Sequence, residues 1–179
     1  MKRLSIVAAL VLAACTTTPT PRPTSQPTPT PTPPAFASVT VSGVGTIPRG
    51  GSSAATLTLS FNEASAAAIG RGPGSFQVTL SDQTGSASTL SFVGTPSTAK
   101  SPGSLGASAT VFGAVLAVRI LDSDQVNIEQ IIVTGIGISV SSTAALGSIK
   151  ATMGGFTGSL SGGATNDVLA SPGSVVSSP

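Results

Sequence analysis

The 179-residue sequence contains no histidine, tyrosine or tryptophan, and it has a single cysteine, Cys15. Acid–base catalysis near neutral pH relies most often on histidine, and cysteine is an intrinsically strong nucleophile. A lone cysteine also cannot form a disulfide bond within the chain. We therefore predict that the protein is not an enzyme.

Charged residues are also scarce, because they make up 8% of the chain where about 25% is usual for soluble domains. Lys2 and Arg3 account for the formal net charge of +2, since the remaining six cations are balanced by six acids. Binding to phosphates requires a concentrated set of lysine and arginine side chains. The sequence shows no such set, so we predict no nucleic-acid partner.

Residues 1–14 have the order of parts that is typical of an export signal. Lys2 and Arg3 come first, an apolar run covers residues 4–12, and the small residues Ala13 and Ala14 follow. The apolar run is too short for a membrane span, which needs about 20 residues. We predict that residues 1–14 are a cleaved signal peptide.

The sequence Leu12-Ala13-Ala14-Cys15 resembles the lipobox of bacterial lipoproteins. The resemblance implies that Cys15 receives a diacylglyceryl group and that the mature chain is anchored by acyl chains in the cell membrane or outer membrane, facing the periplasm or the exterior. Two or more acyl chains anchor a protein stably. An ordinary secretory signal that ends beside a cysteine is the alternative.

Residues 15–35 form a Pro/Thr-rich linker after the signal. Eight of the twenty residues from 16 to 35 are prolines. Each proline fixes φ and removes a backbone donor, which favours extended polyproline II over helix or sheet. We predict a disordered spacer with a reach of about 60 Å; a polyproline ligand for another domain is the alternative.

Residues 36–160 alternate between apolar and polar residues in short runs that are separated by glycine and proline, a pattern that predicts half-buried strands. We predict an all-β fold with a single antiparallel β-sandwich of seven to eight strands, immunoglobulin-like or cohesin-like. The apolar positions that we expect to face the core are Val39, Val41, Leu57, Leu59, Phe61, Phe76, Val78, Leu80, Leu90, Phe92, Phe112, Leu116, Val118, Ile120, Ile132, Ile136, Ile138, Val140, Ile149, Ala151 and Met153.

Two other segments carry weaker local patterns. Asn62 as a cap, an alanine run and Gly70 after the end predict one short helix over residues 63–69. The glycine- and serine-rich residues 161–179 predict a flexible tail.

Four stretches of the domain resemble the β-sandwich repeats of bacterial surface-layer and cell-surface proteins. They are residues 57–63 (LTLSFNE) with 76–80 (FQVTL), residues 131–136 (IIVTGI), and residues 147–152 (GSIKAT). In that group such modules space, assemble or present other domains, so the resemblance implies a structural or protein-binding role.

Asp122, Asp124 and Glu129 gather carboxylate oxygens between two apolar runs. Calcium prefers six to eight oxygen ligands and is often held in such connecting loops. The sequence therefore predicts a calcium site, with a polar turn of solvated acids as the alternative. No other cofactor is predicted.

These observations favour a membrane-tethered lipoprotein outside the cytoplasm that acts as a non-enzymatic structural or protein-binding module of the cell envelope. Few charged residues guard the strand edges, so the partner would be an envelope protein or a second copy of the chain. A surface lipoprotein that binds calcium or another small ligand is the alternative.

Overall fold

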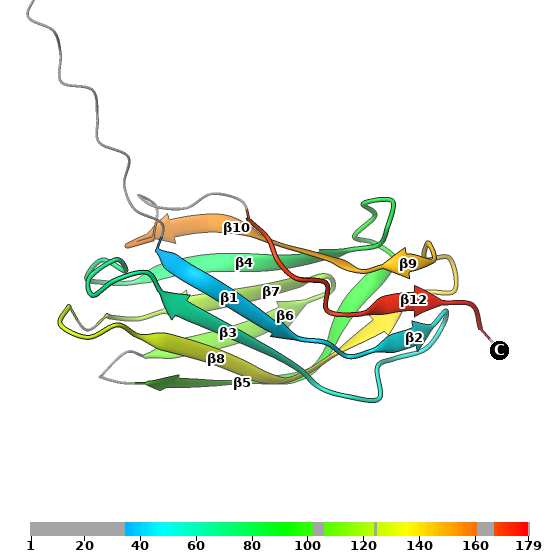
Figure 1. The fold of residues 1–179 in the computed structure, drawn as a ribbon, viewed down its shortest axis with the longest axis horizontal. Helices are drawn as coiled ribbons and strands as arrows, with labels where there is room; N and C mark the ends of the chain where they lie inside the picture. The colour runs from blue at the N-terminus through cyan, green and yellow to red at the C-terminus, as the bar shows by residue number, and fades with distance from the viewer. Residues whose placement is uncertain (1–34, 102–105, 124, 161–166, 179) are drawn as a thin grey trace, which may run out of the picture. The chain divides into compact units, whose positions relative to one another are not determined.

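The computed structural model describes residues 35–101, 106–123, 125–160 and 167–178 (Figure 1). All of them belong to one compact unit, Pro31–Pro179. The described residues form twelve strands and no helix, so none of their segments is a helix of the length and apolarity that a membrane crossing requires. The strands are β1 (Phe36–Ser42), β2 (Thr46–Pro48), β3 (Leu57–Glu63), β4 (Gly74–Ser81), β5 (Leu90–Ser101), β6 (Ala107–Phe112), β7 (Val115–Ile120), β8 (Gln130–Val140), β9 (Gly147–Ser148), β10 (Lys150–Gly158), β11 (Asp167–Val168) and β12 (Ser174–Val176).

Two antiparallel sheets form the layers of a β-sandwich. The four-stranded sheet has the order β1-β3-β8-β5, and the five-stranded sheet has the order β11-β10-β4-β7-β6 (Figure 1). A small third sheet, β2-β12-β9, contains a parallel pair between β2 and β12. The predicted all-β antiparallel sandwich is confirmed, with more strands than the seven to eight expected and with this one parallel pair.

The core lies between the two sheets and is made by the alternating apolar residues of their inner faces. Phe36, Phe61 and Phe76 are buried, with ring centroids 4.8 to 5.8 Å apart in tilted and edge-on arrangements. Such geometry is favourable because the positive edge of one ring meets the negative face of the next. These three rings join β1 and β3 to β4 across the sandwich.

Two residues that the alternation assigned to the core face outward instead. Phe112 is 68% exposed. Residues 113–114 form the turn between β6 and β7, so that Phe112 pairs with Val115. Directly opposed residues share a face of the sheet, and the side chain of Val115 lies on the outer face. Ile132 is half-buried while Ile131 is buried. The irregularity of β8 near Gly135 shifts its inward positions by one residue.

The predicted helix over residues 63–69 is wrong. Glu63 belongs to β3 and is 2% exposed, and its carboxylate accepts hydrogen bonds from the backbone N–H groups of Ile69 at 2.8 Å and Glu129 at 2.9 Å. Ala67 has a φ of 67°, which is unfavourable in a right-handed helix. The buried carboxylate therefore organises this segment as a loop.

Within the tail that the sequence predicts to be flexible, residues 167–168 form β11 and residues 174–176 form β12, whereas residues 161–166 lie outside the described residues. β12 pairs with both β2 and β9, and Val175 is 2% exposed. The Ser171 hydroxyl donates a hydrogen bond to the Ile149 carbonyl at 2.8 Å. Backbone pairing with neighbouring strands and the burial of Leu169 and Val175 hold this segment in place.

Candidate functional site

The residues that the sequence singled out are only partly within the described structure. Cys15 and Asp124 lie outside it. Asp122 accepts hydrogen bonds from the Ser123 N–H at 2.9 Å and the Gly72 N–H at 3.4 Å, and Glu129 is buried. No three His, Cys, Asp or Glu side chains in the described part of the chain are grouped to hold a metal. Because Asp124 is not described, the calcium site stays a prediction, which calcium-dependent thermal unfolding tests.

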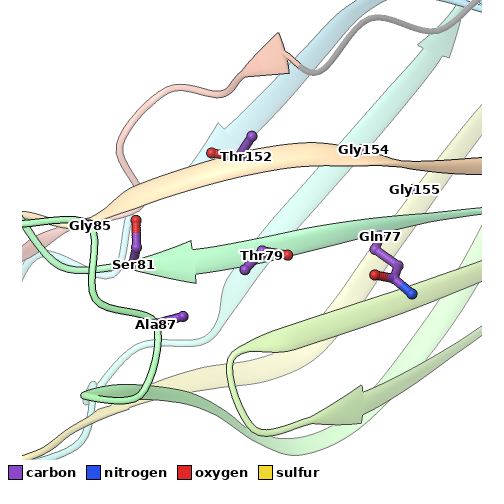
Figure 2. A pocket seen from close by; sticks show the side chains of 8 residues that line it. All are labelled: Gln77, Thr79, Ser81, Gly85, Ala87, Thr152, Gly154 and Gly155. Carbon is purple, nitrogen blue, oxygen red and sulfur yellow. The ribbon is translucent and has the colours of Figure 1, made fainter.

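A groove lies on the outer face of the five-stranded sheet, and we call it the β4–β10 groove. Its volume is about 380 Å³. Figure 2 shows the outward side chains of β4 and β10 beside the loop that connects β4 to β5. The lining residues are Gln77, Thr79, Ser81, Gly85, Ala87, Thr152, Gly154 and Gly155.

Strand register places the floor of this groove in the middle of a row that crosses all five strands. Thr79 pairs with Thr152 on one side and with Val115 on the other. Thr152 in turn pairs with Val168, and Val115 with Phe112. Directly opposed residues share a face of a sheet. The row therefore begins at Val168, which is 76% exposed, and ends at Phe112, which is 68% exposed.

A second row runs parallel to the first through Gly154, Gln77, Ala117 and Thr110. Neither row contains a charged residue. Charges occur only in the rows on either side, where Lys150 pairs with Ser81 and Arg119 pairs with Ser75. The middle of this outer face is thus neutral, with small side chains, hydroxyl groups and one amide.

The wall of the groove is a loop that follows β4 and is organised by Asp82. One carboxylate oxygen of Asp82 accepts hydrogen bonds from the Thr84 hydroxyl at 2.6 Å, the Thr84 N–H at 2.9 Å and the Ser86 N–H at 3.1 Å. The other accepts from the Thr89 hydroxyl at 2.9 Å and the Ala145 N–H at 3.1 Å. The hydrogen bonds from Thr84, Ala145, Thr89 and Ser86 hold the pKa of the Asp82 carboxyl well below its usual range, against the opposing effect of its burial.

The same loop is also tied to β10. The ammonium group of Lys150 donates a hydrogen bond to the Gln83 carbonyl at 2.9 Å. Lys150 is therefore engaged with the loop at the rim of the groove. Lys150 and Asp82 thus hold the wall at two points.

This arrangement provides hydrogen-bond donors and acceptors without ionised groups on the floor. Alternation predicted that Gln77, Thr79 and Thr152 would point away from the core. It gave no indication that a loop would stand over them to make a groove. Asp82 was also missed, although an acid between Ser81 and several Ser and Thr residues is a local signal of a side chain that accepts backbone hydrogen bonds.

Comparison with known proteins finds no matching family model and no matching curated protein. Among solved structures, the chain is similar to the sixth cohesin of scaffoldin B from Acetivibrio cellulolyticus, solved in complex with a mutant Cel5 dockerin, at 19% identity and a TM-score of 0.37. The match covers 78% of this chain and 97% of the cohesin. It is also similar to a non-cellulosomal cohesin from Archaeoglobus fulgidus, at 16% identity and a TM-score of 0.32, covering 79% and 93% of the two chains. At such TM-scores, the properties of these cohesins do not transfer to this chain by likeness.

Proposed function

We propose that this chain is a non-enzymatic protein-binding module of the cell envelope, and that it binds its partner with the outer face of the five-stranded sheet. The proposal depends on the two rows of uncharged residues that cross this face. An exposed phenylalanine lies at the end of one row, and a pre-formed groove lies in the middle of the face.

A solvent-exposed sheet face is usually covered by lysine and glutamate, whose desolvation opposes docking. Here docking would desolvate only uncharged side chains in the two rows. Phe112 can act as an aromatic anchor, because it gains a large apolar contact when a partner covers it. The groove floor, with Gln77 and Thr79, would supply directional hydrogen bonds that select the partner.

The rigid wall also favours binding. A loop that is already held by the five hydrogen bonds of Asp82 loses little conformational entropy when a ligand enters the groove. A groove built in this way suits an extended neutral segment of a partner protein better than a charged one.

Two matched substitutions test the binding face. Thr79→Arg places a long charged side chain on the groove floor, and Ser97→Arg places the same side chain on β5 of the other sheet, where Ser97 is exposed. We expect the parent chain and Ser97→Arg to retain the same envelope proteins in affinity purification, and Thr79→Arg to lose them. Equal retention by both variants would exclude this face.

We further propose that the module is tethered to the membrane through a lipidated Cys15 and held away from it by the Pro/Thr-rich linker. The lipobox-like sequence before Cys15 supports this. Mass spectrometry of the purified chain should show an acylated N-terminal Cys15, and Cys15→Ser should move the protein from the membrane fraction to the soluble fraction. An unmodified Cys15 in a membrane-bound chain would contradict the tether.

A further inference from the structure

The edge strand β1 contains a short palindrome. Residues 38–42 read Ser-Val-Thr-Val-Ser, which is the same sequence in both directions with Thr40 at its centre. Ser38, Thr40 and Ser42 are exposed, whereas Val39 and Val41 are half-buried against the core. The strand contains no charged residue and no proline.

Among the described strands, β1 pairs with β3 alone, and it forms one edge of the four-stranded sheet. Alternate backbone N–H and C=O groups of an edge strand point away from its only neighbour, which makes the edge a template for another strand. On this side residues 36–39 and residues 168–170 line a groove of about 220 Å³. Beyond the end of β1, the Val44 N–H donates a hydrogen bond to the Pro172 carbonyl at 2.6 Å. The first half of the edge therefore borders this groove, with residues 168–170 on the groove's other side.

Natural sheets protect such edges with lysine, proline or bulges. In β1 the only protective feature of this kind is the irregularity between Phe36 and Ser38, which lies before the palindrome. Residues 38–42 pair with β3 in unbroken register. This part of the edge is regular, neutral and rich in β-branched residues, which favours strand pairing.

We propose that the chain forms a two-fold symmetric dimer in which β1 pairs antiparallel with β1 of a second copy, centred on Thr40. A two-fold interface requires a surface that is complementary to itself. The palindrome meets this requirement, because the pairing sets Ser38 opposite Ser42, Val39 opposite Val41 and Thr40 opposite Thr40.

Each of these opposed pairs is favourable. Pairs of β-branched residues and pairs of Ser and Thr stabilise antiparallel strands, whereas like charges directly opposite each other destabilise them. The pairing would also bring together the two half-buried valines of each copy, which covers apolar surface that the monomer leaves partly in contact with water. The four-stranded sheets of the two copies would then continue into one eight-stranded sheet.

The paired segment is short, so the contact belongs to the small class of interfaces that dissociate readily. Two copies held on one membrane would raise their local concentration and favour the dimer. The dimer edge belongs to the four-stranded sheet, whereas the β4–β10 groove belongs to the other sheet. Failure of one proposal therefore leaves the other standing.

Cysteine crosslinking of the full chain tests the register of the dimer. Directly opposed residues in antiparallel strands have Cα atoms about 4.5 to 5.5 Å apart, within the range of a disulfide bond. Thr40→Cys should therefore form a disulfide-linked dimer under mild oxidation. Ser38→Cys alone should not, because the two Ser38 positions would be about 13 Å apart. Co-production of Ser38→Cys with Ser42→Cys should restore the crosslink.

The parent chain, whose only cysteine is Cys15, sets the background of crosslinking. A dimer yield for Thr40→Cys no higher than that of the parent chain or of Ser38→Cys would overturn the proposal. As an independent measurement, sedimentation of the purified parent chain at high concentration should show self-association. Thr40→Lys, which places two like charges at the symmetry axis, should remove it. Thr40 is exposed, so the urea midpoints of both Thr40 variants should match the parent value.

Discussion

At the scale of single residues, Asp82 shows how one carboxylate organises a binding wall. It is 1% exposed and joins two loops, because it accepts hydrogen bonds from residues of the β4–β5 loop and from Ala145 after β8. The sequence shows an acid in a Ser- and Thr-rich turn. The contact with Ala145 spans 63 residues along the chain and follows from the fold alone.

Replacing Asp82 with asparagine should lower the free energy of unfolding by about 2 kcal/mol, because the charge-assisted hydrogen bonds are lost. The lowered pKa means that the carboxylate contributes its full stabilisation above its unfolded-state pKa of about 4. This contribution declines as the pH falls from about 4 towards the lower folded-state pKa. Urea unfolding measured from pH 7 to pH 2 should therefore show a smaller difference between parent and Asp82→Asn at the acidic end.

A difference between the two proteins that stays constant over this range would contradict the assigned role of the charge. Thr84→Val provides a matched control on the donor side, because it removes one hydroxyl donor and leaves the carboxylate in place. It should lose about 1 kcal/mol.

At the scale of the strands, two glycines allow β5 and β8 to stay paired through a shared irregularity. Gly94 and Gly135 have φ values of 95° and 77°, in the region that strongly favours glycine. A Cβ atom on Gly135 would lie 2.6 Å from the Thr95 carbonyl oxygen, and one on Gly94 would lie 2.5 Å from the Gly135 carbonyl oxygen. The close approach of the two backbones thus excludes any side chain at either position.

Gly135→Ala should therefore destabilise the fold by about 3 kcal/mol, from the strained φ together with the clash with Thr95. Gly113→Ala is the matched control. Its φ is 57°, but a Cβ atom there meets nothing within 4 Å, so only the cost of about 1 to 2 kcal/mol for the backbone conformation applies. Equal losses in thermal unfolding of the two variants would show that the close approach has no energetic effect.

The sequence predicted strands well where alternation is uninterrupted, as for Phe76, Val78 and Leu80 in β4, which are all buried. It failed where a turn or an irregularity within a strand shifts the apolar–polar alternation by one residue. The turn before Val115 and the irregularity at Gly135 both moved residues to the opposite face. Both features contain a glycine. Glycine is common throughout this chain, so its presence alone does not identify either feature in the sequence.

At the scale of the whole molecule, the fold is closed by its last strand. β12 pairs with β9 and with β2. Along the chain, β2 lies at least 126 residues before β12. Val175 then covers the core beside Ile47, which is fully buried. Such long-range pairing cannot be read from three residues in a Gly/Ser-rich segment, and for this reason the sequence predicted a flexible tail there.

Val175→Ala should lower the free energy of unfolding by about 2 kcal/mol, because two buried methyl groups are removed. The neighbouring Val176 belongs to the same strand but is half-buried, and Val176→Ala should cost less than about 1 kcal/mol. Chemical denaturation of both variants measures the difference. A flexible segment would instead tolerate both substitutions equally.

The neutral face of the five-stranded sheet is the feature on which the proposed function depends, and it extends over residues from all five strands. Site-specific photo-crosslinking in the producing cell tests it most directly, with the photoreactive residue at Thr79 on the groove floor or, as a control, at Thr58 on β3 of the other sheet. The proposed function predicts a discrete crosslinked protein from Thr79 and none of that mass from Thr58. The absence of any crosslinked protein from Thr79, or the same product from both positions, would contradict it.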